Sequence, residues 1–174
     1  MSDAHHCRLF VRLPAGSGFE EALNRALADP EAASLLLPTD LSIDATRAAV
    51  KRIQAGDRPA LIVDDVERRS ALQADGVHLT DATRVRAVRA ELGDGLVLGA
   101  ECPLERHACM VAAEDGADYV AVHITAENFE EAEELLAWWH EMMTTPIVAL
   151  VDAPIEIERL KSYADFISLP LNCG

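Results

Sequence analysis

The chain has 174 residues, half of them hydrophobic, which is enough for one domain with a sizeable core. Thirty acidic residues against fifteen basic ones give a net charge of −15, which argues against binding to nucleic acid or to anionic membrane surfaces. The four cysteines form no CxxC pair and the N-terminus has no apolar signal segment, so we expect reduced thiols and a cytoplasmic location.

Short apolar segments of strand length alternate with amphipathic helical segments along the whole chain. We expect strands at 7–13, 33–37, 60–63, 77–79, 96–100, 119–124, 147–151 and 166–169. We expect helices at 19–28, 45–54, 66–73, 83–92, 103–114, 129–143 and 155–163. Ser42 or Asp44 can cap the second of these helices, and Pro103 suits the first turn of the fifth.

The segment 61–83 fixes the direction of the strands. Its two apolar strands are joined by one short helical segment, so they must be parallel. Eight such strands predict an α/β fold, a (β/α)8 TIM barrel forming a single domain over residues 1–174, with a doubly wound open sheet as the alternative. Since about 250 residues is usual, this barrel would be shortened and would lack the last helix. A second copy covering that seam would make the protein a homodimer.

Several stretches in the middle of the chain resemble the thiamine phosphate synthase family, which includes the thiazole tautomerases called TenI. They read VDD at 63–65, ADGVHLTDAT at 74–83, GAEC at 99–102 and DGADYV at 115–120. The resemblance implies a βα barrel of thiamine-biosynthesis ancestry. In active members it implies the coupling of an aminopyrimidine diphosphate with a thiazole phosphate, assisted by Mg²⁺.

The resemblance also assigns candidate site residues. It places the magnesium carboxylates at Asp64 or Asp65 and near Asp81, and it marks Asp81, Glu101 and Cys102 as substrate-binding positions at the ends of strands. The chain departs from the family elsewhere. The diphosphate-binding segment after the second strand falls on residues 35–39, which contain no cation, and the glycine pair after the seventh strand falls on residues 151–152.

A diphosphate leaving group needs positive charge where negative charge develops. The only two lysines, Lys51 and Lys161, fall in predicted helices, and Arg12 is the one arginine that we expect near the strand ends. Carboxylates dominate there instead, at Asp40, Asp64, Asp65, Asp81, Glu101, Glu127 and Asp152. We therefore expect a barrel that keeps the fold of the family without its coupling reaction; an active synthase is the alternative.

Other functions stay open. His123 falls one residue short of the acid–base histidine of TenI proteins, and because strand side chains alternate, it can face either side of its strand. An acidic metal site is open as well, in which oxygen ligands bind Mg²⁺ from Asp64, Asp65, Asp81 and Glu101, although Asp65 and Asp81 also suit helix caps.

The chain can also be a non-catalytic binding or regulatory barrel, with a small-molecule ligand at the C-terminal ends of the strands. Trp138 and Trp139 are adjacent on one predicted helix and project about 100° apart, so we expect one to pack on the barrel and the other to lie at an interface. His78 points away from Val77 and Leu79, and we expect it to be a structural histidine with satisfied hydrogen bonds.

Overall fold

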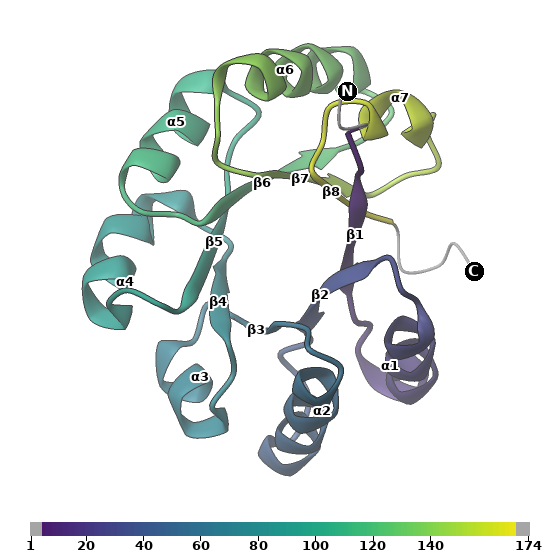
Figure 1. The fold of residues 1–174 in the computed structure, drawn as a ribbon, viewed down its shortest axis with the longest axis vertical. Helices are drawn as coiled ribbons and strands as arrows, with labels where there is room; N and C mark the ends of the chain where they lie inside the picture. Colours follow the sequence, from purple (N-terminus) through teal and green to yellow (C-terminus); the bar gives the residue numbers. More distant parts are fainter. Residues whose placement is uncertain (1–4, 170–174) are drawn as a thin grey trace.

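A computed structural model of the chain describes residues 5–169 and contains eight parallel strands that close into a barrel in sequence order. The helices lie outside the ring of strands (Figure 1). The strands are β1 (Arg8–Arg12), β2 (Ala32–Leu37), β3 (Ala60–Val63), β4 (Gly76–Leu79), β5 (Val97–Glu101), β6 (Tyr119–Ile124), β7 (Ile147–Val151) and β8 (Phe166–Ser168). The helices are α1 (Phe19–Ala28), α2 (Ile43–Ala55), α3 (Val66–Leu72), α4 (Val85–Leu92), α5 (Arg106–Glu114), α6 (Phe129–Met142) and α7 (Ile157–Lys161), with 3-10 turns η1 (Gly16–Gly18) and η2 (Ala82–Arg84).

The pairing of the first strand with the last decides between the two predicted architectures. Arg8 pairs with Phe166 and Leu9 with Ile167, so the sheet closes, which confirms the TIM barrel and rules out the open sheet. This seam has two paired positions, whereas β6 and β7 share five. The segment for which we expected no eighth helix lies outside the described residues. Within residues 5–169, no helix is both long enough and apolar enough to cross a membrane.

The helix caps follow from the sequence with one correction. Ser42 accepts a hydrogen bond from the backbone N–H of Ala45 and caps α2, as one of the two predicted alternatives. The prediction that Pro103 opens a helix is wrong, because α5 begins at Arg106. The backbone N–H of Glu105 turns back to the carbonyl of Pro103 at 2.7 Å, and this tight turn delays the helix by three residues.

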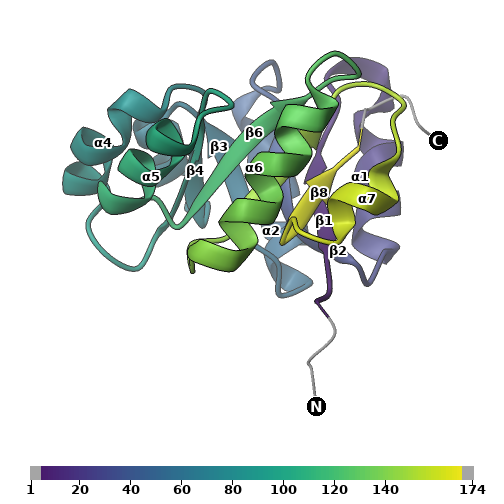
Figure 2. The same ribbon diagram turned by 90° about the horizontal axis from the view of Figure 1, so that it is seen from above.

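The two faces of each strand carry different side chains. On β6, Val120, Val122 and Ile124 belong to the large apolar cluster that includes the outer helices, while Tyr119 and Ala121 belong to the small cluster at the barrel centre. His123 follows Tyr119 and Ala121 on the inner face. Figure 2 shows the barrel from the side, with α6 lying beside β6 and α7 beside β8.

The two adjacent tryptophans of α6 differ in burial, and this confirms one part of the prediction made for them. Trp139 is buried, and its indole N–H donates to the carbonyl of Thr145 at 2.7 Å, so the prediction that one of the pair packs on the barrel is confirmed. Trp138 is partly buried, with the guanidinium of Arg106 4.8 Å from its ring centre. Its expected place at an interface stays a prediction.

Gly99 makes room for the phenol ring of Tyr119 at the centre of the barrel. A Cβ atom added at Gly99 would lie 1.9 Å from Cζ of Tyr119, which is buried among Phe10 and His78. The glycine of the GAEC segment is therefore required by packing. This position lets one large ring occupy a space that two side chains would otherwise share.

We predict that Gly99→Ala destabilises the fold by about 1–3 kcal/mol, because the added methyl group displaces the Tyr119 ring in a closely packed core. Urea unfolding followed by circular dichroism measures this change. Gly18→Ala is the matched control, since the nearest atom to its added Cβ is 3.8 Å away, and its free energy of unfolding should change by less than about 1 kcal/mol. Equal effects of the two substitutions would contradict the packing argument.

Candidate active site

A continuous row of polar side chains crosses the C-terminal end of the barrel, which we call the mouth. The carboxylate of Glu101, at the end of β5, contacts Nε2 of His78 at 3.0 Å and Nε2 of His123 at 2.8 Å. Nδ1 of His123 contacts Asp152 at 2.5 Å, and Asp152 accepts from Nη1 of Arg12 at 2.8 Å. We call these five residues, together with Tyr119 and Ser168, the mouth network.

Arg12 closes one end of the mouth network. Its Nε donates to Oγ of Ser168 at 2.8 Å, and its Nη2 donates to the carbonyl of Val151 at 2.9 Å. With Nη1 on Asp152, all three nitrogens of the guanidinium have a partner within the barrel. Arg12 thus joins β1 to both β7 and β8 at the seam where the strands pair least.

The buried end of the mouth network consists of His78 and Tyr119. His78 is fully buried on the inner face of β4, and its Nδ1 lies 2.6 Å from the hydroxyl of Tyr119. Because the ionised carboxylate of Glu101 can only accept, Nε2 of His78 donates to it, which leaves Nδ1 to accept a hydrogen bond from the Tyr119 hydroxyl. Burial raises the pKa of Tyr119 well above its usual range, which keeps this hydroxyl protonated. His78 is therefore a structural histidine with both nitrogens satisfied, as the sequence predicted.

The carboxylate and imidazole at the centre hold opposite charges. Burial disfavours the charge on Glu101, but hydrogen bonds from His123 and His78 outweigh it and lower the pKa of Glu101 to about 2. The hydrogen bond to Glu101 is the main cause that raises the pKa of His123 to about 9, against the effect of burial. Burial also disfavours the charge on Asp152, but hydrogen bonds from His123 and Arg12 lower its pKa. At neutral pH Glu101 and Asp152 are therefore carboxylates, while His123 and Arg12 are cations.

A cavity of about 670 Å³ opens beside this network, between the end of β4 and helix α5. Asp81, Glu101, Cys102 and His123 all line it, so the structure brings the predicted catalytic histidine together with the three predicted substrate-binding residues. Hydrogen bonding with Cys109 and burial raise the pKa of the Cys102 thiol, which stays neutral and is a weak nucleophile. A second histidine, His107, lines the same cavity outside the mouth network.

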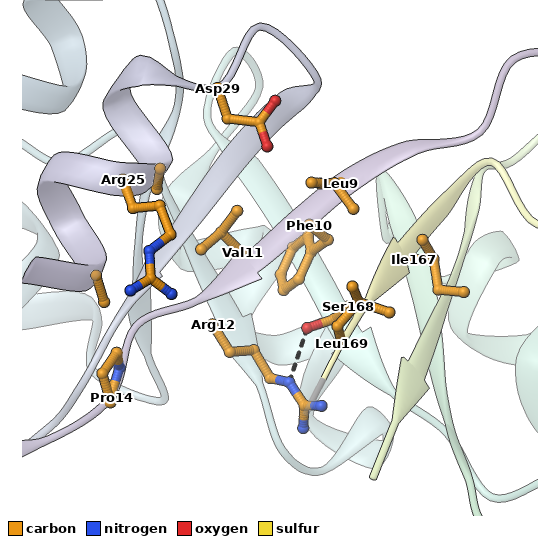
Figure 3. A pocket seen from close by; sticks show the side chains of 12 residues that line it. Leu9, Phe10, Val11, Arg12, Pro14, Arg25, Asp29, Ile167, Ser168 and Leu169 are labelled. Carbon is orange, nitrogen blue, oxygen red and sulfur yellow. Dashed lines mark hydrogen bonds between the residues drawn. The ribbon is translucent and has the colours of Figure 1, made fainter. Parts of the chain in front are cut away.

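A second cavity, of about 250 Å³, lies at the seam between β1, α1 and β8. Figure 3 shows Arg12 and Ser168 joined by their hydrogen bond at one end of this cavity and Asp29 at the other, with Ile167 and Leu169 along one side. The lining is mostly apolar apart from these groups and Arg25, whose guanidinium pairs with Glu21. Arg12 lines this cavity as well as contributing to the mouth.

Comparisons with known proteins agree on one family. A family model described as thiamine monophosphate synthase matches residues 36–164. The thiamine-phosphate synthase of Rhodospirillum centenum is 31% identical over 185 residues, which covers 97% of this chain and 88% of that protein. This chain belongs to the thiamine phosphate synthase family.

Other similarities agree with this family assignment. The thiamine-phosphate synthase of Hyphomonas neptunium is 36% identical over 150 residues, covering 77% of this chain and 68% of that protein. Among solved structures, the thiamine phosphate pyrophosphorylase of Pyrococcus furiosus superposes with a TM-score of 0.77 at 19% identity, covering 95% of this chain and 87% of that one. Tryptophan synthase from M. tuberculosis, at a TM-score of 0.70 and 14% identity over 96% of this chain and 84% of that one, shares the fold alone.

The carboxylates that the family resemblance assigns to Mg²⁺ have other partners here. Asp64 accepts from the backbone N–H and hydroxyl of Thr80 and from Nη1 of Arg84, at 2.9, 2.5 and 3.2 Å. Asp65 caps α3 through the N–H of Arg68, and Asp81 caps η2. Within residues 5–169, no three acidic, histidine or cysteine side chains gather as a metal site. All three carboxylates thus already accept hydrogen bonds from protein groups.

Sequence reasoning missed how the residues of the mouth network contact one another. It recognised Arg12 and Asp152 as separate charges at strand ends, but not that they pair. It placed the family's last phosphate loop at Ser168 without its contact to Arg12, and it assigned no role to Tyr119. It also missed Arg84, which lies close enough to the mouth to neutralise Asp64. The inward alternation of Tyr119, Ala121 and His123 was the one available signal for the direction of His123.

We predict that the stability of this family member falls as the pH rises from 6.5 to 9. The pKa of His123 is raised in the folded chain, so its stabilising charge is fully present below pH 6.5 and is lost as the pH passes about 9. Urea unfolding at several pH values should show this loss in the wild type and a smaller loss in His123→Gln. An identical pH dependence in the two proteins would contradict the assignment of this charge.

We also predict that Mg²⁺ and Mn²⁺ produce no saturable heat of binding in calorimetry, because Asp64, Asp65 and Asp81 are occupied by protein donors. Asp64→Asn serves as the control, since it removes a carboxylate that the family resemblance assigns to Mg²⁺. A one-site binding isotherm in the wild type that disappears in Asp64→Asn would show that the ion displaces Thr80 and Arg84.

Proposed function

We propose that this chain is a barrel of the thiamine phosphate synthase family that does not catalyse the standard coupling of a pyrimidine diphosphate with a thiazole phosphate. One observation carries the proposal. Every nitrogen of Arg12, the guanidinium at the mouth, already donates to Ser168, Asp152 or the carbonyl of Val151. A phosphate would therefore have to compete with these three protein acceptors for the guanidinium.

The other cationic groups near the strand ends are similarly engaged. Arg84 pairs with Asp64, and Arg68 donates to the carbonyl of Leu41 and the hydroxyl of Thr46. A charge-assisted hydrogen bond contributes about 1.5–3 kcal/mol, so three or four missing donors would remove on the order of 5 kcal/mol of diphosphate stabilisation. That loss corresponds to a rate reduction on the order of a thousandfold or more.

The names of the relatives support the opposite alternative, an active synthase, and a direct assay separates the two. We expect no coupling of the two precursors above background in the presence of Mg²⁺. The Rhodospirillum centenum relative is the positive control under the same conditions. Turnover by this chain at about 1 s⁻¹ or faster, within the ordinary range for enzymes, would refute the proposal. Rescue of growth in a bacterium lacking thiamine phosphate synthase would contradict it in cells.

A second candidate function is proton transfer of the TenI tautomerase type. The observation that favours it is the placement of His123, which lines the 670 Å³ cavity and is held as an imidazolium between Glu101 and Asp152. Both of its N–H groups are in use, so a ligand must replace one carboxylate before it can exchange a proton with the ring. Asp152 is the more exposed partner, at 36% against 20% for Glu101.

The tautomerase candidate predicts deuterium exchange into a thiazole carboxylate phosphate in heavy water. This exchange should be lost in His123→Ala, because the ring that carries the proton is gone. His107→Ala is the matched control, since it removes another histidine from the wall of the same cavity without touching the mouth network. Exchange that is absent from the wild type, or that depends equally on both histidines, would exclude this candidate.

A further inference from the structure

Asp152 lies between the two positively charged side chains of the mouth network and contacts both. Its Oδ1 accepts from Nη1 of Arg12 at 2.8 Å, and its Oδ2 accepts from Nδ1 of His123 at 2.5 Å. Both oxygens of one planar carboxylate are therefore held by charged donors from β1 and β6. This is the environment that a protein provides for a bound oxyanion, and here the protein supplies the anion itself.

The position of this carboxylate in the barrel supports the comparison with a bound anion. Asp152 is the first residue after β7, and Ser168, which fixes Arg12, is the last residue of β8. TIM barrels frequently bind phosphate groups at the loops that follow their seventh and eighth strands. Ser168 is 1% exposed, so the support behind Arg12 is rigid and buried.

Charge balance shows what Asp152 contributes. The groups that face one another here are Arg12 from β1, Glu101 from β5, His123 from β6 and Asp152 after β7. With His123 protonated, two positive and two negative charges sum to zero. Without Asp152, the remaining three groups carry a net charge of +1, while the hydrogen bond from Nε2 of His78 still holds Glu101 in place.

Asp152 can leave this position without unfolding the barrel. Its backbone N–H donates to the carbonyl of Ile124 at 3.0 Å, which holds the main chain independently of the side chain. The side chain is 36% exposed, so rotation toward solvent has room. The contact between the carboxylate and its two cations is thus a side-chain interaction that a competing anion can replace.

We propose that Arg12 and His123 form an anion-binding site for a phosphate group and that Asp152 blocks it as an internal anion. The proposal deepens the proposed function, because the same ion pairs leave the mouth without free positive charge. The ligand class is a phosphate monoester or inorganic phosphate, whose oxygens would accept from Nη1 of Arg12 and Nδ1 of His123. In the unmodified chain such a ligand competes with a tethered carboxylate, which lowers its apparent affinity.

Titration of Asp152→Ala with inorganic phosphate at pH 6 and constant ionic strength tests the proposal, with calorimetry and the ring ¹⁵N signals of His123 as readouts. We expect phosphate to bind at least about tenfold more tightly than to the wild type, since one charge-assisted interaction becomes available. Glu127→Ala removes an exposed carboxylate from the loop after β6 and should bind phosphate as the wild type does. The double variant Arg12→Ala/Asp152→Ala should lose the gain.

An equal gain in Glu127→Ala would overturn the proposal, because it would reflect net charge alone. A folded Asp152→Ala with no gain, or a gain that survives the removal of Arg12, would overturn it as well. Should Asp152→Ala fail to fold, Asp152→Asn preserves the shape of the side chain, and the same outcomes apply to it. Coupling activity in the wild type would refute the proposed function but not the blocked site, since the phosphate titration measures the blocked site separately.

Discussion

The carboxylate of Glu101, which accepts hydrogen bonds from two imidazoles, is the interaction on which the mouth of this barrel depends. One oxygen binds the buried His78 and the other binds the exposed His123, so the buried centre of the barrel and its exposed mouth are joined through a single ionised group. Its charge holds His123 protonated, and that proton in turn holds Asp152. Removing the charge at Glu101 would leave both imidazoles without their common partner.

The same interaction explains which residues occur in the segments that resemble the family. The segments ADGVH, GAEC and GADYV supply His78, Gly99, Glu101 and Tyr119, which meet at the barrel centre although they are far apart in the chain. Gly99 leaves the space that the Tyr119 ring fills, and the ring hydroxyl fixes the tautomer of His78. The segments thus encode one packed polar cluster, whatever reaction the barrel performs.

Much of the fold was predictable from hydrophobic periodicity. All eight strands were expected near their observed positions, because each is a short apolar run bounded by polar or turn residues. The start of α5 was misplaced, because the turn from Pro103 to Glu105 depends on a local hydrogen bond that helix propensity does not reveal. The direction of His123 also required the structure, because a shift of one residue along a strand reverses its facing.

The mouth network was harder to predict from the sequence than the fold, for a physical reason. Arg12 lies on β1, whereas Asp152 follows β7 and Ser168 ends β8. Because β1 reaches these strands only when the barrel closes, nothing in the local sequence indicates that Arg12 contacts the other two residues. Their individual charges suggested an acidic rim that would repel phosphate. The structure shows instead that Asp152 forms an ion pair with Arg12, so the charge of each residue is balanced by the other.

The seam between β1 and β8 gives Arg12 a mechanical role besides its electrostatic one. These strands pair at two positions, and above them the guanidinium spans from β1 to Ser168 and to the carbonyl of Val151. A ligand that displaced Arg12 from these partners would weaken the strand pair with the fewest paired positions in the barrel. Binding of a ligand at the mouth would therefore change how often β1 separates from β8. Hydrogen exchange of the backbone amides in these two strands would detect that change even without catalysis.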